Sequence, residues 1–207
     1  MKTLILLMAL ISAGAAAYAD SDETNQGVFQ PETLFGSHGI AIGAYGGPVG
    51  GAAYLGGKFY PMAGGEGAVI IDHWLIIGGA GRGLVQPVVS PSGNEIESGW
   101  GGMMAGFIIM PEYLIHPYVK AVIGGGSVNE YSGNMYNGNN WNTNFVQSQG
   151  FFSLDGEVGV QMNVCKWLRI DVYGGYHYIY GPLAFDGMTD DNFRNFDAGI
   201  KFDFGWF

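Results

Sequence analysis

Apolar and polar residues alternate with period two through the last part of the chain, over 168–180 and 193–207. In each stretch, aromatic and aliphatic side chains hold one set of positions and ionisable side chains hold the other. Successive side chains of a β-strand point to opposite faces, so each stretch predicts a strand with one apolar face and one charged face. The ionisable set consists of Arg169, Asp171, His177, Asp197, Lys201 and Asp203.

The same alternation, bounded by turn residues, predicts eight strands. We expect them at 37–53, 58–72, 74–85, 98–110, 114–127, 149–163, 167–180 and 193–207. Short turns alternate with long polar loops, the turns at 72–73, 110–113 and 163–166 and the loops at 86–97, 128–148 and 181–192. Outer-membrane barrels have short periplasmic turns and longer outer loops. The pattern therefore predicts an all-β, eight-stranded antiparallel up-and-down transmembrane β-barrel over residues 36–207.

When the apolar face of each strand is assigned to lipid, eleven ionisable residues face the lumen. They are Glu66, Arg82, Lys120, Asp155, Glu157, Arg169, Asp171, His177, Asp197, Lys201 and Asp203. His38 would add the first strand to this set, and the fourth segment is apolar on both faces and gives no assignment. Eight strands leave an interior that side chains just fill. Because buried charges are costly unless paired, we expect a plugged, ion-paired lumen and not an open pore.

The start of the chain predicts export. Lys2, the apolar run 4–11 and the sequence Ala17-Tyr18-Ala19 have the organisation of a secretory signal peptide. We expect residues 1–19 to be removed and 20–35 to form a short periplasmic segment before the barrel. The mature chain would then hold seven bases and eighteen acids, a formal charge of −11, which argues against nucleic-acid binding.

The sequence also excludes two structural features. No later stretch has eighteen uninterrupted apolar residues, so no transmembrane helix is expected. Cys165 is the only cysteine, which excludes an internal disulfide, and it lies too far from the cleavage site to be a lipid anchor.

Glycine recurs throughout, with 37 residues and many adjacent pairs. Each glycine disfavours a helix by ~1 kcal/mol relative to alanine, whereas bends and curvature in a small closed sheet use it. The run from Gly78 to Gly83 has the glycine density of a phosphate-binding loop, but Pro87 follows shortly after and no helix start does, so nucleotide binding is not expected. Gly79, Gly81 and Gly83 would form a flat outer stripe for lipid or a second chain, although curvature alone is the preferred explanation.

Two runs carry a resemblance to a known class. They are Tyr45-Gly-Gly-Pro-Val49 and the run from Gly67 to Leu84, Gly-Ala-Val-Ile-Ile-Asp-His-Trp-Leu-Ile-Ile-Gly-Gly-Ala-Gly-Arg-Gly-Leu. They resemble small uncharacterised outer-membrane β-barrel proteins of Gram-negative bacteria, closely over roughly 45–85 and by strand pattern elsewhere. The resemblance implies the fold and carries no activity. Proteins of this class end with the terminal aromatic on the lipid face, whereas Phe207 is out of phase with Phe204 and Trp206. Either Phe207 flares at the rim or Trp206 is the anchor.

Three groups of residues are candidates for chemistry or binding. His177 with the lumen acids and Ser153 would form a hydrolase set if the two lay within hydrogen-bond reach, but a lumen ion pair is the preferred role of His177. The Asn-rich loop 128–148 combines amides with aromatic rings, a mixture used by adaptable binding loops. Its candidates for partner contact are Tyr131, Tyr136, Trp141 and Phe145, against the alternative of a solvated surface loop.

The third group is Asp186, Asp190 and Asp191, which lack the spacing of a calcium loop and predict a solvated acidic segment. No metal or other cofactor is expected. The sequence therefore predicts a non-catalytic outer-membrane barrel with a structural or surface-binding role through its long loops. Its expected partners are outer-membrane lipid, the assembly machinery and a surface ligand. Two alternatives stay open: a barrel enzyme acting on envelope lipids, similar to a lipid A deacylase, and a soluble periplasmic barrel that binds a small apolar ligand.

Overall fold

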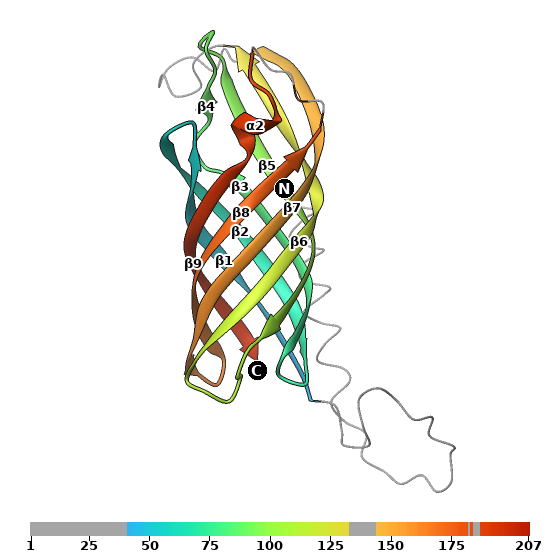
Figure 1. Cartoon of the computed structure of the whole chain (residues 1–207), viewed down its shortest axis with the longest axis vertical. Helices are drawn as coiled ribbons and strands as arrows, with labels where there is room; N and C mark the ends of the chain where they lie inside the picture. Colours follow the sequence, from blue (N-terminus) through green and yellow to red (C-terminus); the bar gives the residue numbers. More distant parts are fainter. Residues whose placement is uncertain (1–40, 133–143, 182, 184–186) are drawn as a thin grey trace, which may run out of the picture. The chain divides into compact units, whose positions relative to one another are not determined.

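Eight strands close into a single antiparallel barrel in the computed structural model, which describes residues 41–132, 144–181, 183 and 187–207. The wall consists of β1 (Ile42–Leu55), β2 (Lys58–Ile71), β3 (Leu75–Leu84), β5 (Glu95–Ile108), β6 (Ile115–Ser132), β7 (Asn144–Cys165), β8 (Leu168–Tyr180) and β9 (Asn195–Trp206). Consecutive wall strands pair antiparallel, and the pairing of β1 with β9 closes the ring (Figure 1). The predicted eight-stranded up-and-down barrel is confirmed.

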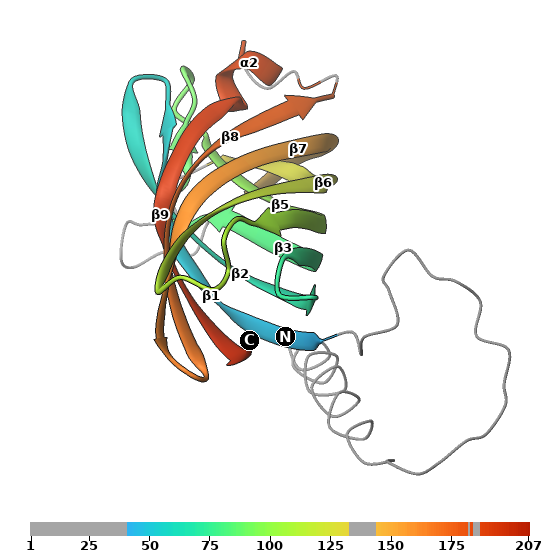
Figure 2. The same cartoon turned by 60° about the horizontal axis from the view of Figure 1, so that its bottom comes forward.

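The two ends of the barrel differ in their connections. Residues 72–74, 109–114 and 166–167 join strands at one end, here called the short-turn end, which comes forward in Figure 2. At the opposite, long-loop end, residues 85–94 join β3 to β5, Gly56–Gly57 form a two-residue turn, and β6 and β8 end at Ser132 and Tyr180. Asp72 and His73 have φ values of 51° and 65°, the left-handed pair that a tight type I′ hairpin requires. Among the described residues, no helix is long and apolar enough to cross a membrane.

Side chains alternate between the interior and the outer surface as the pattern predicts, and the register settles the strand that the pattern left open. Trp100 on β5 pairs with Arg82 on β3, and Arg82 points inward. Trp100 and Met104 are therefore buried, whereas Met103 and Phe107 lie on the outer surface, 75% and 49% exposed. The sequence of β5 did not show which of its faces points inward, because both faces are apolar. Its pairing with β3 shows which face does.

The barrel interior is filled in three layers. An apolar layer at the long-loop end includes Val49, Ile96 and Phe151 and is closed from above by Leu183 and Phe193. Most of the ionisable side chains occupy the middle, and Arg169, Asp171 and Asp203 lie beside the second apolar layer. A second apolar layer lies toward the short-turn end and consists of Tyr45, Ala68, Ile70, Ile76, Met104, Ile108 and Val122.

Whether the curvature of the wall requires a glycine depends on whether the residue faces inward or outward. A Cβ on Gly47, which points inward, would run into the backbone of Phe202 and Asp203 on β9. A Cβ on Gly50, which points outward, would meet no heavy atom within 4 Å. The tight curvature of a small barrel therefore demands glycine at Gly47 and leaves room for a side chain at Gly50.

The three long loops contain more regular structure than the sequence predicted. The segment 86–97 holds the short strand β4 (Val88–Val89), which pairs with the start of β5, and the segment 181–192 contains the start of the single turn α2 (Asp190–Phe193). The largest error concerns 128–148, where β6 continues to Ser132 and β7 begins at Asn144. Asparagine and glutamine made this stretch look like a solvated loop. Cross-strand side-chain hydrogen bonds use those amides instead, such as that from Ser148 Oγ to Asn129 Oδ1 at 2.6 Å.

Candidate functional site

The eleven ionisable residues predicted to face the lumen all point inward and are all buried, each at most 7% exposed. Six of them, from five strands, form one central cluster of three cations and three carboxylates. These are Glu66, Arg82, Lys120, Glu157, Asp197 and Lys201. Each of the three carboxylates is paired with at least one cation, and Asp171 adjoins the cluster through Lys120, since buried charges are costly unless paired.

Glu66 and Glu157 are the two hubs of the central cluster. The ammonium of Lys120 donates to Glu66 Oε1 at 2.7 Å, and the ammonium of Lys201 donates to Glu66 Oε2 at 2.8 Å. Lys201 also pairs with Glu157, which in turn pairs with Arg82. Each carboxylate is therefore held by two cations from different strands, so the cluster ties together opposite parts of the wall.

Tyrosine rings complete the shell around these charges. Tyr118 donates its hydroxyl to Glu157 Oε1 at 2.9 Å, and Lys120 lies 4.4 Å from the centre of the same ring. Lys201 lies 4.7 Å from the centre of the Tyr173 ring. Such cation–π contacts stabilise a desolvated ammonium. The alternation that places Lys120 and Asp171 in the lumen places Tyr118 and Tyr173 there as well, because each tyrosine lies two positions from one of them.

His177 lies nearer the long-loop end, with Asp155 and Trp100. Its Nδ1 is bonded to Asp155, and its ring stacks on Trp100 with centroids 4.2 Å apart. Ser153 is fully buried, and neither its hydroxyl nor His177 Nε2 has a hydrogen-bond partner among the described residues. The serine-to-histidine bond that a hydrolase set needs is thus absent from the described part of the chain. The geometry is that of a buried, hydrogen-bonded histidine–aspartate pair under an aromatic ring.

Phe207 closes the lumen at the short-turn end. Its ring lies 3.9 Å from the guanidinium carbon of Arg169 and packs beside Tyr45, with ring centroids 6.2 Å apart. Arg169 also donates to Gln161 at 3.0 Å. Phe207 is out of phase with Phe204 and Trp206 because its position, like that of Asp203, faces the lumen, so of the two alternatives the flare at the rim is wrong. Trp206 stays on the outer surface and is 73% exposed.

The remaining two lumen acids lie in this short-turn layer. Asp203 accepts a long hydrogen bond of 3.4 Å from Gln161, and an oxygen of Asp171 lies 3.7 Å from the ammonium of Lys120. Gln161 is held in turn by His116 at 3.0 Å. The charges of the lumen therefore form a central cluster flanked by two smaller groups.

Aromatic side chains surround the outer wall near both ends. Toward the long-loop end, Tyr54 packs on Phe59 with centroids 5.0 Å apart, and Tyr176 packs on Phe196 at 4.9 Å. Toward the short-turn end, the stacked pairs are Trp74 with Phe107 and Trp167 with Phe204. Exposed aliphatic side chains fill the zone between them, including Val158, Val172 and Ile200. An apolar band between two aromatic girdles is the surface of a membrane-spanning barrel.

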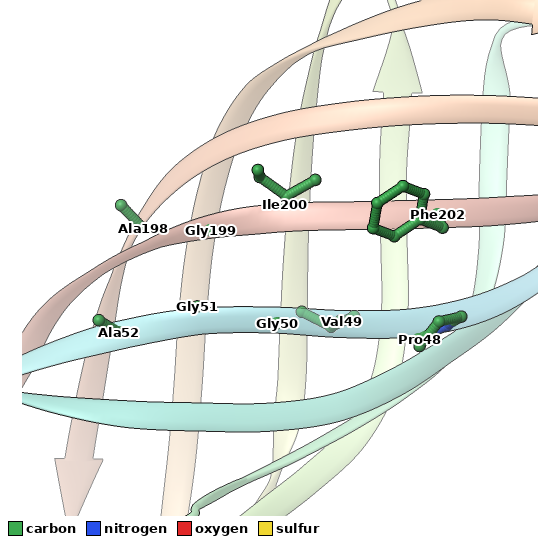
Figure 3. Close-up of a pocket in the computed structure, with 9 residues that line it drawn as sticks. All are labelled: Pro48, Val49, Gly50, Gly51, Ala52, Ala198, Gly199, Ile200 and Phe202. Atoms are coloured by element: carbon green, nitrogen blue, oxygen red, sulfur yellow. The ribbon is translucent and has the colours of Figure 1, made fainter.

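An open apolar groove crosses this band between β1 and β9 (Figure 3). Gly50 presents no side chain to the groove on β1, and Ile200 and Phe202 line it on β9. Nothing in the sequence pattern predicted this groove. It belongs to the lipid-facing surface and is separate from the charged lumen.

The predicted loop residues fall into three groups. Tyr131 and Phe145 lie opposite each other on β6 and β7, with ring centroids 5.9 Å apart, so they belong to strands and not to a loop. Tyr136, Trp141 and Asp186 lie outside the described residues. Asp190 accepts the backbone N–H groups of Gly181 and Leu183, and Asp191 pairs with Arg194. In the described segments, no three acidic, histidine or cysteine side chains are grouped so that they would hold a metal ion.

The fold has counterparts among solved structures. No family model matches the chain, and neither does any curated protein. Neisserial surface protein A (NspA) is 13% identical, covers 82% of this chain and 99% of its own, and superposes with a TM-score of 0.53. Ail, the attachment invasion locus protein of Yersinia pestis, is 12% identical, with the same coverage of both chains and a TM-score of 0.50. Ail in complex with the heparin analogue sucrose octasulfate gives 13% identity and a TM-score of 0.49, covering 80% and 97%. At these identities the likeness concerns the fold, and it confirms the resemblance to small outer-membrane β-barrels at that level.

Proposed function

We propose that this protein is an outer-membrane β-barrel without catalysis of its own, which serves a structural or surface-binding role through its long-loop end. The observation that carries the proposal is the inverted polarity of the wall. Ionisable residues such as Lys201 and Asp171 are fully buried, whereas Phe196 and Trp206 are 68% and 73% exposed. A contiguous apolar surface of this extent is unfavourable in water. The soluble-barrel alternative requires the reverse arrangement, with aromatics inside.

The connections support one orientation in the membrane. Long connections lie on the outer side of such barrels and short turns on the periplasmic side, so the long-loop end faces outward. NspA, a surface protein by name, has the same fold, which agrees with this orientation. The strands β5, β6 and β7 continue beyond the girdle at Phe59 and Phe196, and they present Tyr131 and Phe145 outside the membrane.

The interior supports a closed barrel. Charges from β2, β3, β6, β7 and β9 meet in the central cluster, with apolar layers above and below. The girdles and the outer face of β9, with Phe202, Phe204 and Trp206, are the surfaces offered to lipid and to the assembly machinery. The protein needs no cofactor for these roles.

The enzyme alternative has one observation in its favour, the Asp155–His177 pair. A catalytic role for this pair predicts that His177→Ala changes the lipid A profile of cells that express the protein. An unchanged profile removes the alternative. A changed profile contradicts the non-catalytic proposal.

Thiol labelling tests the orientation, because the single cysteine lies at the short-turn end. Cys165 is exposed, and we expect a membrane-impermeant maleimide to label it only after the outer membrane is permeabilised. Ser148→Cys in a Cys165→Ser background should label in intact cells. Labelling of Cys165 in intact cells, or failure to label Ser148→Cys there, contradicts the proposal.

A further inference from the structure

The connection between β5 and β6, residues 109–114, exposes mainly apolar side chains at the short-turn end (Figure 1). They are Ile109, Met110, Tyr113 and Leu114, which are 44%, 54%, 58% and 65% exposed. The other two connections described at this end, 72–74 and 166–167, each combine one tryptophan of the aromatic girdle with aspartate and histidine or with lysine. The turn 109–114 therefore differs in its chemistry from the turns beside it.

Hydrogen bonds fix the backbone of this turn against the neighbouring strands. The main-chain N–H of Asn163 on β7 donates to the carbonyl of Leu114 at 3.0 Å, and the side-chain amide of Asn163 donates to the carbonyl of Tyr113 at 3.3 Å. The ring Nδ1 of His116 lies 3.0 Å from the same carbonyl of Tyr113. Within the turn, the N–H of Tyr113 donates to the carbonyl of Met110 at 3.2 Å. The exposed apolar side chains are thus presented by a defined backbone.

Met110 occupies a backbone conformation that its side chain does not favour. Its φ is 55°, in the left-handed region where glycine, asparagine and aspartate are enriched. In the turn between β2 and β3 the same region is occupied by Asp72 and His73, which are polar. Met110 is 54% exposed, so packing inside the barrel does not account for it. A bulky apolar residue held in this conformation at a surface turn indicates a contact outside the barrel.

The turn continues the apolar outer surface of β6 and β7. Val119 on β6 pairs with Phe107, a member of the aromatic girdle at the short-turn end. From this level to the ends of the two strands, every residue that points outward is apolar; these residues are Val119, Pro117 and Ile115 on β6 and Val158, Val160, Met162 and Val164 on β7. Ile115 is 57% exposed and leads directly into Leu114. Within these described strands, no polar border separates the turn from the apolar band.

This continuity decides which partner the turn fits. A protein-binding patch in water has an apolar centre surrounded by a polar rim, whereas the turn 109–114 merges with the apolar band on the side of β6 and β7. It also carries the exposed acid Glu112 and the exposed Tyr113. A tyrosine combines an apolar ring with a polar hydroxyl, and such residues are enriched where a membrane meets water. These features fit lipid near its head groups.

Building on the proposed placement in the outer membrane, we propose that the turn 109–114 is immersed in the periplasmic leaflet, with its apolar side chains against phospholipid chains next to the head groups. The apolar surface is then taller beside β6 and β7 than beside the polar turn at Asp72 and His73. A membrane protein accommodates such a mismatch by tilting or by a local change in bilayer thickness. The turn would thereby set how deeply this side of the barrel sits in the bilayer.

The test uses the full mature chain in liposomes of phosphatidylethanolamine and phosphatidylglycerol, with one bimane label whose emission reports its surroundings. Cys165→Ser removes the native cysteine, and the label is attached through Leu114→Cys, through His73→Cys in the polar turn, or through Ile200→Cys in the apolar band. We expect the Leu114 label to emit at shorter wavelength than the His73 label and to lose the quenching by aqueous iodide that the His73 label shows. Lipids with a nitroxide near the head group should quench the Leu114 label more than the Ile200 label, because the turn lies close to the membrane surface.

The gel mobility of unheated samples shows whether each variant has folded before labelling, and Met110→Cys provides a second site in the turn. Equal exposure of the Leu114 and His73 labels to iodide, while the Ile200 label stays shielded, overturns the inference alone. Exposure of the Ile200 label overturns the proposed membrane placement, so the two failures are distinguishable.

A photoreactive residue separates lipid from protein partners. Tyr113→p-benzoylphenylalanine, illuminated in intact cells, should form crosslinks to phospholipid. A crosslink to a periplasmic protein or to a second copy of the chain in place of lipid would make that protein the occupant and overturn the inference.

Discussion

Removal of the Lys201 charge tests whether the central cluster holds the barrel together. Lys201 is fully buried, and its ammonium serves both hubs, Glu66 at 2.8 Å and Glu157. Lys201→Met keeps most of the side-chain volume but leaves Arg82 and Lys120 as the only cations paired with Glu66, Glu157, Asp197 and Asp171 among the described residues. Removing one partner from a buried ion pair costs about 3–5 kcal/mol, because it leaves an uncompensated charge. We expect the free energy of unfolding to fall by that amount.

A double variant tests whether Lys201 and Glu157 interact directly. Glu157→Gln alone should also destabilise the barrel, whereas Lys201→Met combined with Glu157→Gln restores the balance of charge. The loss of unfolding free energy in the double variant should be smaller than the sum of the losses in the two single variants by roughly 1–3 kcal/mol. Lys166→Met, at an exposed turn, is the control and should stay within about 0.5 kcal/mol of the parent.

Urea unfolding of the barrel in liposomes provides the measurement, followed by tryptophan fluorescence and by the mobility of unheated samples on gels. The reasoning is refuted if Lys201→Met is no more destabilising than Lys166→Met. It is also refuted if the double variant loses as much unfolding free energy as Lys201→Met and Glu157→Gln lose together, since the two charges would then not interact.

Three further predictions follow from the wall and the lumen. Ile200→Lys, on the apolar band, should destabilise the membrane-inserted barrel by about 2–4 kcal/mol, as measured by urea unfolding in liposomes, and Phe145→Lys outside the band should not. Gly47→Ala should lower the yield of folded barrel, because its Cβ meets the backbone of β9, whereas Gly50→Ala should fold normally; the gel mobility of unheated samples separates the two. The parent protein should carry no steady ion current in a planar bilayer, and open-channel conductance would contradict the filled lumen.

The alternating pattern predicted most of the wall because each strand has one apolar and one charged face, and the side-chain period of a strand is two. That period sufficed to place residues such as Lys120 and Asp203 inside. It failed for β5, whose two faces are both apolar, until the register with Arg82 on β3 fixed the direction of Trp100.

The pairing inside the lumen was beyond prediction from the sequence, because it depends on which strands meet across the barrel. Arg82 bonds Asp197, which lies 115 positions away in the chain, and no local pattern records such a distance. The extension of β6 and β7 was missed for a different reason. Its amides suggested solvent exposure, whereas the amide of Gln147 donates across the strands to Glu130 at 2.7 Å. Phe207 follows the period of β9 into the lumen, as Asp203 does, and its ring lies there against the guanidinium of Arg169.

The central claim is that an apolar outer wall with a charged interior places this chain in the outer membrane. Fractionation of the cell envelope, with gel analysis of samples before and after boiling, tests it most directly. The account predicts that the protein is recovered in the outer-membrane fraction and that its gel mobility shifts when the barrel is unfolded by heat. Recovery in the soluble fraction, with the same mobility before and after boiling, would contradict it.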